Sequence, residues 1–417
     1  MIILDYDKVA HCLKTSAYVT TPFYSLDNGD VYSMIIAGSA GVPFLQGALA
    51  FCDDIQKYEC HKMPMADERI HIIFNHDVIE SDKNNFETIS DLCRGWVLKN
   101  GKWILDDVKC ISVQRQLLSR FGGIIETDII AGKKVLIMGV GSFGSDIALG
   151  LVKSGVTYFI LIDDDRFDIP NIMRHICGLS QVGRYKTKAI ADIILDKNSS
   201  ATVTTFEKRV NRQNSELLRD LIRSADIVVC AIDDRDGKVL TNRLCVEENK
   251  TCIFTGAFRR AYGGQILRVH PHQSLCYQCF LKSLPEQAAN QEISNDRQAK
   301  AISYSDRPVP VEPGLANDIT PITQMVCKLV IQELLKDKNT TLRSLDEDLA
   351  APLYLWFNRR ETGSDQENWE PLEFNCDGMH ILRWYGVAID ADPACPVCGD
   401  FLKELARQQG HKTSNKE

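Results

Sequence analysis

Glycines, acidic residues, an amide and two cations lie close together in one stretch of the sequence, from Lys133 to Lys188. A short apolar run ends in Gly139, Gly141 and Gly144, and a helical pattern follows at once. Glycines suit such a turn because the chain bends tightly and a phosphate oxygen must approach the backbone N–H groups. The start of the helix adds a partial positive charge. This spacing predicts a phosphate-binding loop between a strand and a helix.

Charged and polar residues follow this loop in a fixed order. Asp163 ends the second apolar run, 19 residues after Gly144, where a carboxylate can accept hydrogen bonds from ribose hydroxyls. A glycine loop with such an acid is most often a nicotinamide or flavin site, so a dehydrogenase is the first alternative. The next segment, however, adds a second acid, an amide and two cations: Asp165, Asn171, Arg174 and Lys186. That set suits a triphosphate whose charge is neutralised while its α-phosphorus is attacked, and it favours ATP.

The order of these motifs resembles that of the ThiF/MoeB/HesA superfamily of adenylating enzymes, which includes the ubiquitin-activating enzymes. The family's glycine loop, Asp-x-Asp, Asn-x-x-Arg and Gly-x-x-Lys motifs correspond to the residues above, with Gly183 before Lys186. Asp233, after an apolar strand over residues 225–230, corresponds to the family's metal-binding aspartate, and Gly256 and Gly264 fall on the next strand pair. The resemblance covers about residues 131–400 and implies an α/β fold with a Rossmann-like, mostly parallel sheet.

By this resemblance, a carboxylate attacks the α-phosphorus of ATP and gives an acyl adenylate and pyrophosphate, with no protein nucleophile. Asp163 would hold the ribose and Asp233 would bind Mg²⁺. The phosphates would be stabilised by Asn171, Arg174 and Lys186. The structural alternatives are that Asp163 only caps a strand and that Lys186 is a solvated surface lysine.

Some positions depart from the family pattern. The family commonly has Asn and Arg where this chain has Asp234 and Lys238, and lysine cannot make the bidentate contacts of arginine. Asp234 would either bind the metal more tightly or face solvent. The resemblance implies a homodimer in which the partner subunit supplies an arginine from just before the first strand. Arg115 and Arg120 are the nearest candidates, at a spacing that does not match well.

Two C-x-x-C pairs, Cys276 with Cys279 and Cys395 with Cys398, lie in turn-prone contexts. Four thiolates at this spacing fit a closed, tetrahedral structural Zn²⁺ site. Two redox motifs or four unrelated thiols are the alternative. The long gap between the pairs implies that the metal ties the C-terminal segment back onto the domain.

The composition suits a large cytoplasmic enzyme of two to three domains: 417 residues, 44% apolar and 25% charged. We expect neither a membrane partner nor a signal peptide, because apolar runs are short and acids interrupt the N-terminus. Fifteen cysteines are then reduced thiols and metal ligands. The net charge of −8 argues against nucleic acid as a partner.

The sequence predicts an N-terminal α+β accessory domain over residues 1–130, an adenylation domain with both cysteine pairs over 131–405, and a flexible tail over 406–417. In the first domain we expect a strand over 70–74, a hairpin at Asn100-Gly101 and a short helix over 47–55. A second metal held by Cys52, Cys60, His61, Cys93 and Cys110 is less expected than buried thiols. In the second we expect helices over 186–195, 215–223, 236–249 and 318–336, and a polar crossover loop over 284–310.

The acyl substrate is implied only by the resemblance: the C-terminal glycine of a ubiquitin-like or sulfur-carrier protein, passed on to a conjugating enzyme or sulfur donor. By analogy, the N-terminal domain would clamp that partner. The alternatives are a ribosomal peptide, a carboxylate on modified tRNA, or a non-catalytic scaffold. No cysteine lies between Cys279 and Cys327, and Cys177 and Cys376 are the outside candidates for a thiol acceptor. We therefore expect no stable thioester on this chain.

Overall fold

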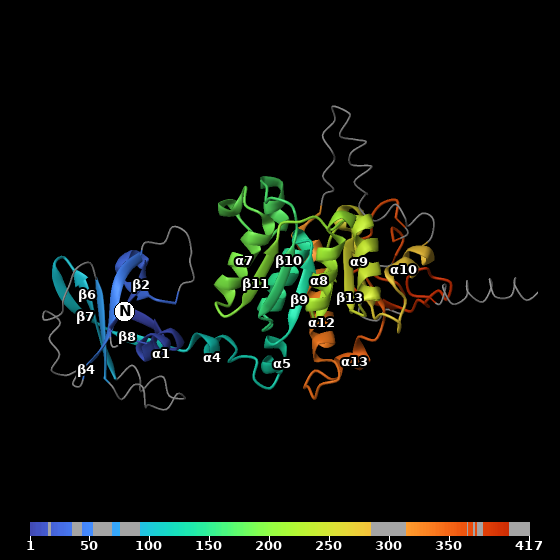
Figure 1. Cartoon of the computed structure of the whole chain (residues 1–417). Helices are drawn as coiled ribbons and strands as arrows, with labels where there is room; N and C mark the ends of the chain where they lie inside the picture. Colours follow the sequence, from blue (N-terminus) through green and yellow to red (C-terminus); the bar gives the residue numbers. More distant parts are fainter. Residues whose placement is uncertain are drawn as a thin grey trace, which may run out of the picture. The chain divides into compact units, whose positions relative to one another are not determined.

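The structure is a computed structural model of the whole chain (Figure 1). It describes residues 1–15, 18–35, 44–52, 69–75, 92–284, 314–364, 366–369, 372 and 378–399. The chain divides into two compact units, Met1–Gly122 and Gly123–Glu417, which we describe separately. The predicted crossover loop lies almost entirely outside the described residues, as do the predicted tail, Cys60, His61 and Cys376. Among the described residues, no helix combines the length and apolar character that crossing a bilayer requires.

The N-terminal unit is built on an eight-stranded sheet in the order β7-β6-β5-β4-β2-β3-β1-β8. In chain order its elements are β1 (Ile2–Asp5), α1 (Tyr6–Thr15), β2 (Tyr18–Leu26), β3 (Val31–Ser33), β4 (Phe44–Cys52), β5 (Ile70–Asn75), β6 (Cys93–Lys99), β7 (Lys102–Asp106), β8 (Val108–Ile111) and α4 (Val113–Leu117). Its core is formed by side chains from strands across this sheet, among them Leu4, Phe23 and Ile72.

Two sequence predictions for this unit are confirmed and one is wrong. Strand β5 lies where expected, and the β6–β7 hairpin turns at Asn100 and Gly101, which have φ angles of 53° and 76°. The expected helix over 47–55 is instead strand β4, which pairs with β2 and β5. Pairing with strands that are distant in the sequence decides this conformation. Gly47 permits close packing in the strand, because a Cβ atom at this position would come within 2.4 Å of the Phe23 ring.

Among the thiols of this unit that the structure describes, Cys93 and Cys110 are buried, as expected, and Cys52 is partly buried. No metal-ligand cluster forms among the described residues of this unit.

The second unit contains a mixed eight-stranded sheet in the order β11-β10-β9-β12-β13-β14-β15-β16. Its strands are β9 (Lys134–Met138), β10 (Tyr158–Ile162), β11 (Thr202–Phe206), β12 (Ile227–Cys230), β13 (Cys252–Ala257), β14 (Gly263–Val269), β15 (Leu353–Phe357) and β16 (Trp384–Val387). The first five in the spatial order are parallel, and the last three pair antiparallel. The expectation of a mostly parallel sheet therefore holds for one half, since the short connection from β13 to β14 can join only antiparallel strands.

Helices cover both faces of this sheet (Figure 1). They are α5 (Thr127–Ala131), α6 (Ser142–Val152), α7 (Lys186–Lys197), α8 (Ser215–Ser224), α9 (Arg235–Glu247), α10 (Tyr277–Ser283), α12 (Ala316–Leu335) and α13 (Leu345–Asp348). All four predicted helices are confirmed within a few residues. Along β9, Val135 and Ile137 pack with α6, α7 and α12, whereas Leu136 and Met138 pack with α8, α9 and α10. Because successive strand residues face opposite sides, one apolar strand serves two cores.

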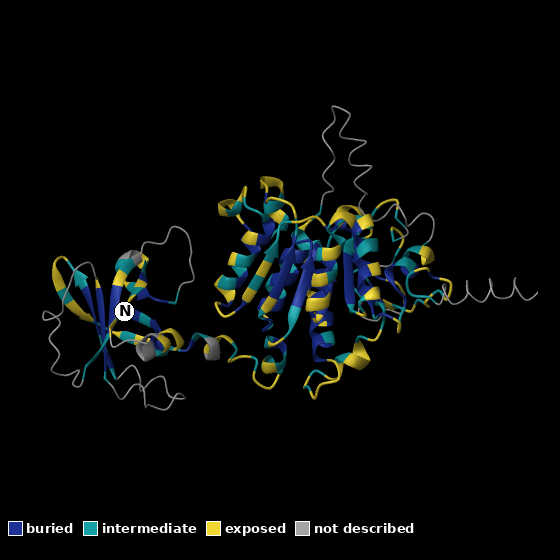
Figure 2. Ribbon diagram, viewed as in Figure 1, coloured by how far each residue is buried: buried dark blue, intermediate teal, exposed yellow. Residues whose placement is uncertain are grey.

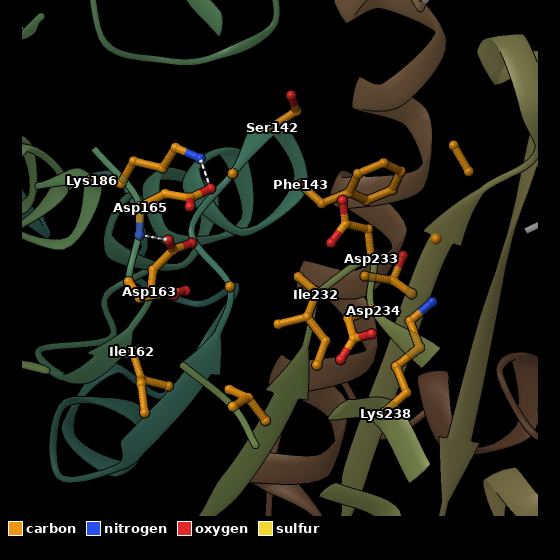
Figure 3. Close-up of a pocket in the computed structure, with 18 of the residues that line it drawn as sticks. Ser142, Phe143, Ile162, Asp163, Asp165, Lys186, Ile232, Asp233, Asp234 and Lys238 are labelled. Atoms are coloured by element: carbon orange, nitrogen blue, oxygen red, sulfur yellow. Dashed lines mark hydrogen bonds and ion pairs between the residues drawn. The ribbon is translucent and has the colours of Figure 1, made fainter. Parts of the chain in front are cut away.

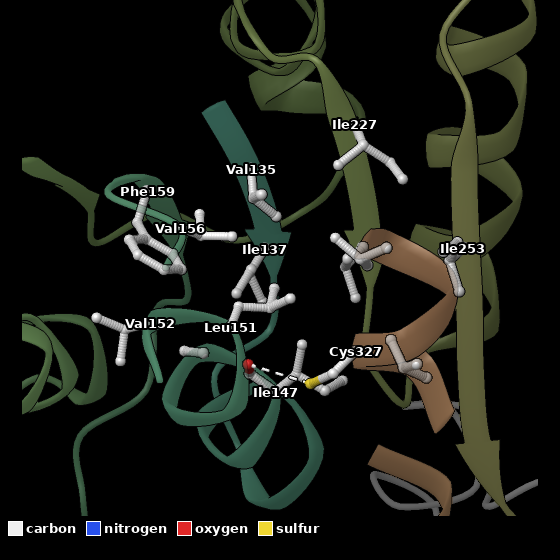
Figure 4. Close-up of a cluster of buried hydrophobic side chains, with 14 of the residues drawn as sticks. Val135, Ile137, Ile147, Leu151, Val152, Val156, Phe159, Ile227, Ile253 and Cys327 are labelled. Atoms are coloured by element: carbon white, nitrogen blue, oxygen red, sulfur yellow. Dashed lines mark hydrogen bonds between the residues drawn. The ribbon is translucent and has the colours of Figure 1, made fainter. Parts of the chain in front are cut away.

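Helices α6 and α12 pack closely in the first of these cores (Figure 4). The thiol of Cys327 donates to the carbonyl oxygen of Ile147 at 3.6 Å. A Cβ atom at Gly150 would come within 2.6 Å of the same sulfur, so glycine permits the approach. Figure 2 shows the result as strands and inner helix faces that are buried, with exposed residues on the outer faces. The two cores hold the strand ends, where the polar residues lie, in fixed positions.

Candidate functional site

A cavity of about 430 Å³ lies at the carboxyl ends of the parallel strands (Figure 3). Segments that follow four of these strands line it. They include Gly139 and Gly141 to Phe143 after β9, Asp163 to Asp165 after β10, Lys208 and Arg209 after β11, and Ala231 to Asp234 after β12. Loops at this end of an open parallel sheet converge on one crevice, where ligands bind.

The three glycines of the loop have different roles. Gly139 adopts a φ of 82°, which a residue with a side chain rarely adopts, and it lines the cavity together with Gly141. Gly144 does not line the cavity; a Cβ atom there would lie 1.8 Å from the carbonyl oxygen of Gly139. The third glycine therefore lets helix α6 pack against the turn. Gly141 caps this helix without a side-chain hydrogen bond, so the cavity receives the start of α6 with its partial positive charge.

Asp163 is attached to the glycine loop. One carboxylate oxygen accepts a hydrogen bond from the backbone N–H of Val140 at 2.8 Å, and the other accepts from the N–H of Asp165 at 2.9 Å. Burial raises the pKa of Asp163, while the charge of Lys186 and these two N–H groups oppose the rise. The strand-capping alternative is thus part of the observed structure, and the same carboxylate also lines the cavity.

Lys186, in the first turn of α7, points into the same region. Its ammonium group is 2.7 Å from the carboxylate of Asp165, and its backbone N–H donates to the Asp165 carbonyl oxygen at 3.0 Å. The Lys186 side chain is 10% exposed, whereas that of Asp165 is 66% exposed. The alternative of a solvated surface lysine is wrong, because both residues line the cavity and the lysine is held by the acid.

The Asn171 and Arg174 pair lies on a 3₁₀ helix, Ile169–Arg174, that starts with a capping box. Asn171 accepts a hydrogen bond from the N–H of Asp168 at 3.2 Å through its side-chain oxygen. Arg174 lines the cavity, but Asn171 does not. The structure therefore brings Arg174 to the predicted site and uses Asn171 to fix the turn that presents it.

Asp233 and Asp234 both line the cavity, but their surroundings differ (Figure 3). Asp234 is the N-cap of helix α9, and its carboxylate accepts from the N–H of Gly237 at 2.9 Å. The sequence alternatives for Asp234, tighter metal binding or a side chain that faces solvent, did not include this role as a helix cap. Asp233 is exposed at the cavity. Lys238, in the first turn of α9, is 4% exposed and also lines the cavity.

Residues 113–350 match the model of the ThiF family. The chain belongs to the ThiF family. Relatives of this ThiF-family chain include ubiquitin-like modifier-activating enzyme 5 of Caenorhabditis elegans, 29% identical over 172 residues, which are 39% of this chain and 41% of that protein. Another is the adenylyltransferase and sulfurtransferase MOCS3-1 of Zea mays, 30% identical over 182 residues, 43% of this chain and 38% of that protein. The chain thus spans about two fifths of the length of the relatives it matches.

Solved structures with a similar fold include E. coli MccB with ATP. That chain is 22% identical, with a TM-score of 0.45 over 65% of this chain and 68% of MccB. The family match and the observed sheet describe a Rossmann-like ThiF domain in a mixed α/β fold.

Several residues that line the cavity of this ThiF-family chain were not predicted as site residues from the sequence: Ser142, Phe143, Lys208, Arg209, Thr255, Ala257, Ala261, Gly314 and Ile319. Lys208 and Arg209 follow the carboxyl end of β11, and the position of that strand in the parallel sheet was a usable signal. Thr255 gave no such signal. It is 3% exposed, and its hydroxyl has no hydrogen-bond partner among the described residues.

The four cysteines of the two C-x-x-C pairs meet away from the cavity, in the core beside α10. Their sulfur atoms all lie within 4.8 Å of one another, at 4.0 Å for Cys276 to Cys279, 3.7 Å for Cys276 to Cys395 and 3.4 Å for Cys279 to Cys398. A tetrahedral site with Zn–S bonds of about 2.3 Å needs sulfur separations of roughly 3.8 Å. The thiols are free, so the arrangement does not depend on disulfides.

Groups around the sulfurs also suit a metal thiolate site. The N–H of Asp392 donates to the Cys279 sulfur at 3.5 Å. Burial raises the pKa of Cys276, and the side-chain amide of Asn242 opposes this rise by favouring the thiolate. The nitrogen of that amide is buried and has no other hydrogen-bond acceptor among the described residues. Donors directed at sulfur stabilise negative charge there. The residues present therefore fit a closed four-thiolate metal site.

Proposed function

We propose that this chain is an ATP-dependent adenylyltransferase that activates the C-terminal carboxylate of a ubiquitin-like or sulfur-carrier protein. The observation that supports the proposal most strongly is that a glycine loop, Arg174, Lys186 and Asp233 line the same cavity. The names of the relatives support the substrate class, since they include a ubiquitin-like modifier-activating enzyme and an adenylyltransferase. A non-catalytic scaffold would have no need to retain this set of charges.

In this proposal the glycine loop and the start of α6 bind the phosphates, and Asp163 accepts from the ribose through oxygen lone pairs that its two N–H contacts leave available. Arg174 and Lys186 neutralise charge on the phosphates, and Asn171 positions Arg174. Lys186 exchanges or shares its contact with Asp165 when a phosphate oxygen arrives. Asp233 offers the exposed carboxylate oxygen that Mg²⁺ prefers, and bound Mg²⁺ would neutralise further phosphate charge.

The reaction balances without a nucleophile from this chain. A carboxylate oxygen of the substrate forms a bond to the α-phosphorus, and the bond between that phosphorus and the bridging oxygen breaks, so pyrophosphate leaves with the electron pair. The negative charge that shifts to the leaving group is met by the cations of the cavity. A thiol, sulfur donor or amine of a partner then takes the acyl group and releases AMP.

The proposal extends to the rest of the protein as follows. Cys276, Cys279, Cys395 and Cys398 would bind a structural Zn²⁺. Residues 1–130 would form an accessory domain that grips the partner, before an adenylation domain over 131–405 and a tail over 406–417. A homodimer in the cytoplasm, with a conjugating enzyme or sulfur donor as a further partner, is what the family resemblance implies.

The test is ATP:pyrophosphate exchange with a panel of ubiquitin-like and sulfur-carrier proteins, terminal peptides and modified tRNA. We expect exchange that depends on one carrier and disappears when the carboxyl terminus of that carrier is amidated, because an amide cannot attack phosphorus as a carboxylate does. Exchange with only a peptide or tRNA would change the substrate class. Absence of exchange with every candidate, together with micromolar binding of NADH, would return the chain to the dehydrogenase alternative.

We predict that no thioester forms on this chain. Cys177 is 3% exposed and burial raises its pKa to about 11, while Cys327 is 4% exposed and burial raises its pKa to about 12. Thiols in this state are poor nucleophiles near neutral pH, because the thiolate is the reactive form. Intact mass under non-reducing conditions, after incubation with ATP and the cognate carrier, should show no covalent adduct. An adduct that Cys177→Ala or Cys376→Ala removes would contradict this and identify the acceptor.

A further inference from the structure

Both peptide groups of Val140 in the glycine loop are held by side chains. Its N–H donates to Asp163 at 2.8 Å, and its carbonyl oxygen is 2.9 Å from Nε2 of His175. Val140 lies between Gly139 and Gly141, which line the cavity, and its own side chain is fully buried. The loop therefore has a fixed point at Val140, with a flexible residue on each side.

The hydrogen bonds of His175 determine its tautomer. The backbone N–H of Cys177 donates to Nδ1 of His175 at 3.1 Å, so Nδ1 is an acceptor and carries no proton. The ring proton is then on Nε2, from which it is donated to the Val140 carbonyl oxygen. Burial lowers the pKa of His175 to about 4, and the positive charge of Lys186 acts in the same direction. The imidazole is accordingly neutral near pH 7, as both hydrogen bonds require.

His175 directly follows Arg174, which lines the cavity. The imidazole thus connects the segment that presents the arginine to the loop whose backbone faces the same cavity. Its ring also packs against Phe167, at 4.8 Å between centroids, just before the 3₁₀ helix begins. Without the imidazole, the buried Val140 carbonyl would lose its partner, and the loop and the arginine would lose a direct connection.

We propose that His175 is a positioning residue that fixes the glycine loop relative to Arg174 in the geometry that binds polyphosphate. The inference rests on the proposed ATP-binding function and adds a residue to it. A histidine that only fills space beside Phe167 is the alternative. The two differ in what they demand: positioning needs the nitrogen atoms, whereas filling space needs only the ring.

Two substitutions separate these roles. His175→Phe keeps a planar ring against Phe167 and removes both hydrogen bonds. His175→Gln removes the ring but keeps an amide N–H that can donate to the Val140 carbonyl oxygen. For the positioning role we expect the phenylalanine variant to bind ATP about tenfold more weakly or worse, and the glutamine variant to stay within about threefold of wild type. Adenosine, which lacks phosphates, should bind all three proteins with similar affinity.

Calorimetric titration with ATP and with adenosine measures these affinities. Amide hydrogen exchange of the peptide that spans residues 139–144, in protein without nucleotide, reports the loop itself and should be faster only in the phenylalanine variant. The positioning role is overturned if His175→Phe matches wild type in loop exchange, or if it loses ATP and adenosine affinity equally. If wild type binds neither ligand, the proposed function fails, while the exchange measurement still decides whether His175 holds the loop.

Discussion

Asp233→Asn is expected to lower carrier-dependent pyrophosphate exchange by at least about 100-fold, whereas Asp234→Asn should leave it within about threefold of wild type. The two acids are neighbours and both line the cavity, but only Asp234 is occupied as a helix cap. Asparagine is as good an N-cap as aspartate, so the second change preserves helix α9. The first change removes the charge that the proposed Mg²⁺ site requires.

Arg174→Ala should cause a loss of the same order, because a charge-assisted contact to the transferring phosphoryl group contributes about 2 to 4 kcal/mol to the transition state. Exchange rates at saturating carrier, measured with proteins whose unfolding midpoints agree with wild type, give the comparison. Equal losses for Asp233→Asn and Asp234→Asn would mean that general acidity at the cavity matters and not one metal ligand. Near wild-type exchange by Asp233→Asn or Arg174→Ala would contradict the assigned roles.

The sequence was informative wherever a residue's role follows from strand order and local spacing. Gly139, Asp163 and Asp233 each come directly after an apolar run that becomes a parallel strand, and the topology of such a sheet brings those ends together. Their placement at one cavity was therefore predictable before the structure. The helices that follow these strands were predictable from a local pattern, since their apolar residues repeat with helical spacing.

Other features depend on contacts that no local pattern encodes. Strand β4 was predicted as a helix because its partners, β2 and β5, lie elsewhere in the sequence. Asp234 as a helix cap and Asn171 as part of a capping box depend on backbone angles at a turn. His175 appears in the sequence as an ordinary histidine, and its role emerges only when Val140, 35 positions earlier, is seen to face it.

The largest expected effect on stability comes from the four-cysteine cluster. We expect one zinc per chain in freshly purified protein, and none after Cys395→Ser, because a closed site needs all four thiolates. Structural zinc contributes directly to folding free energy, and here it would join α10 to a segment 119 residues away in the sequence. Loss of the metal should lower the unfolding midpoint by at least about 5 °C.

Metal analysis and thermal unfolding, each with and without a chelator, test this expectation. The chelator should lower the midpoint of wild type to that of Cys395→Ser and should not change the variant further. Cys252→Ala, which removes a buried thiol outside the cluster, is the matched control and should retain one zinc.

At temperatures below the unfolding midpoint of Cys395→Ser, pyrophosphate exchange by this variant should stay within about threefold of wild type, because no cysteine of the cluster lines the cavity. Zinc-free wild type that is insensitive to chelation would show that the four thiols pack as a core, and a variant that loses exchange while still folded would connect the metal to the site.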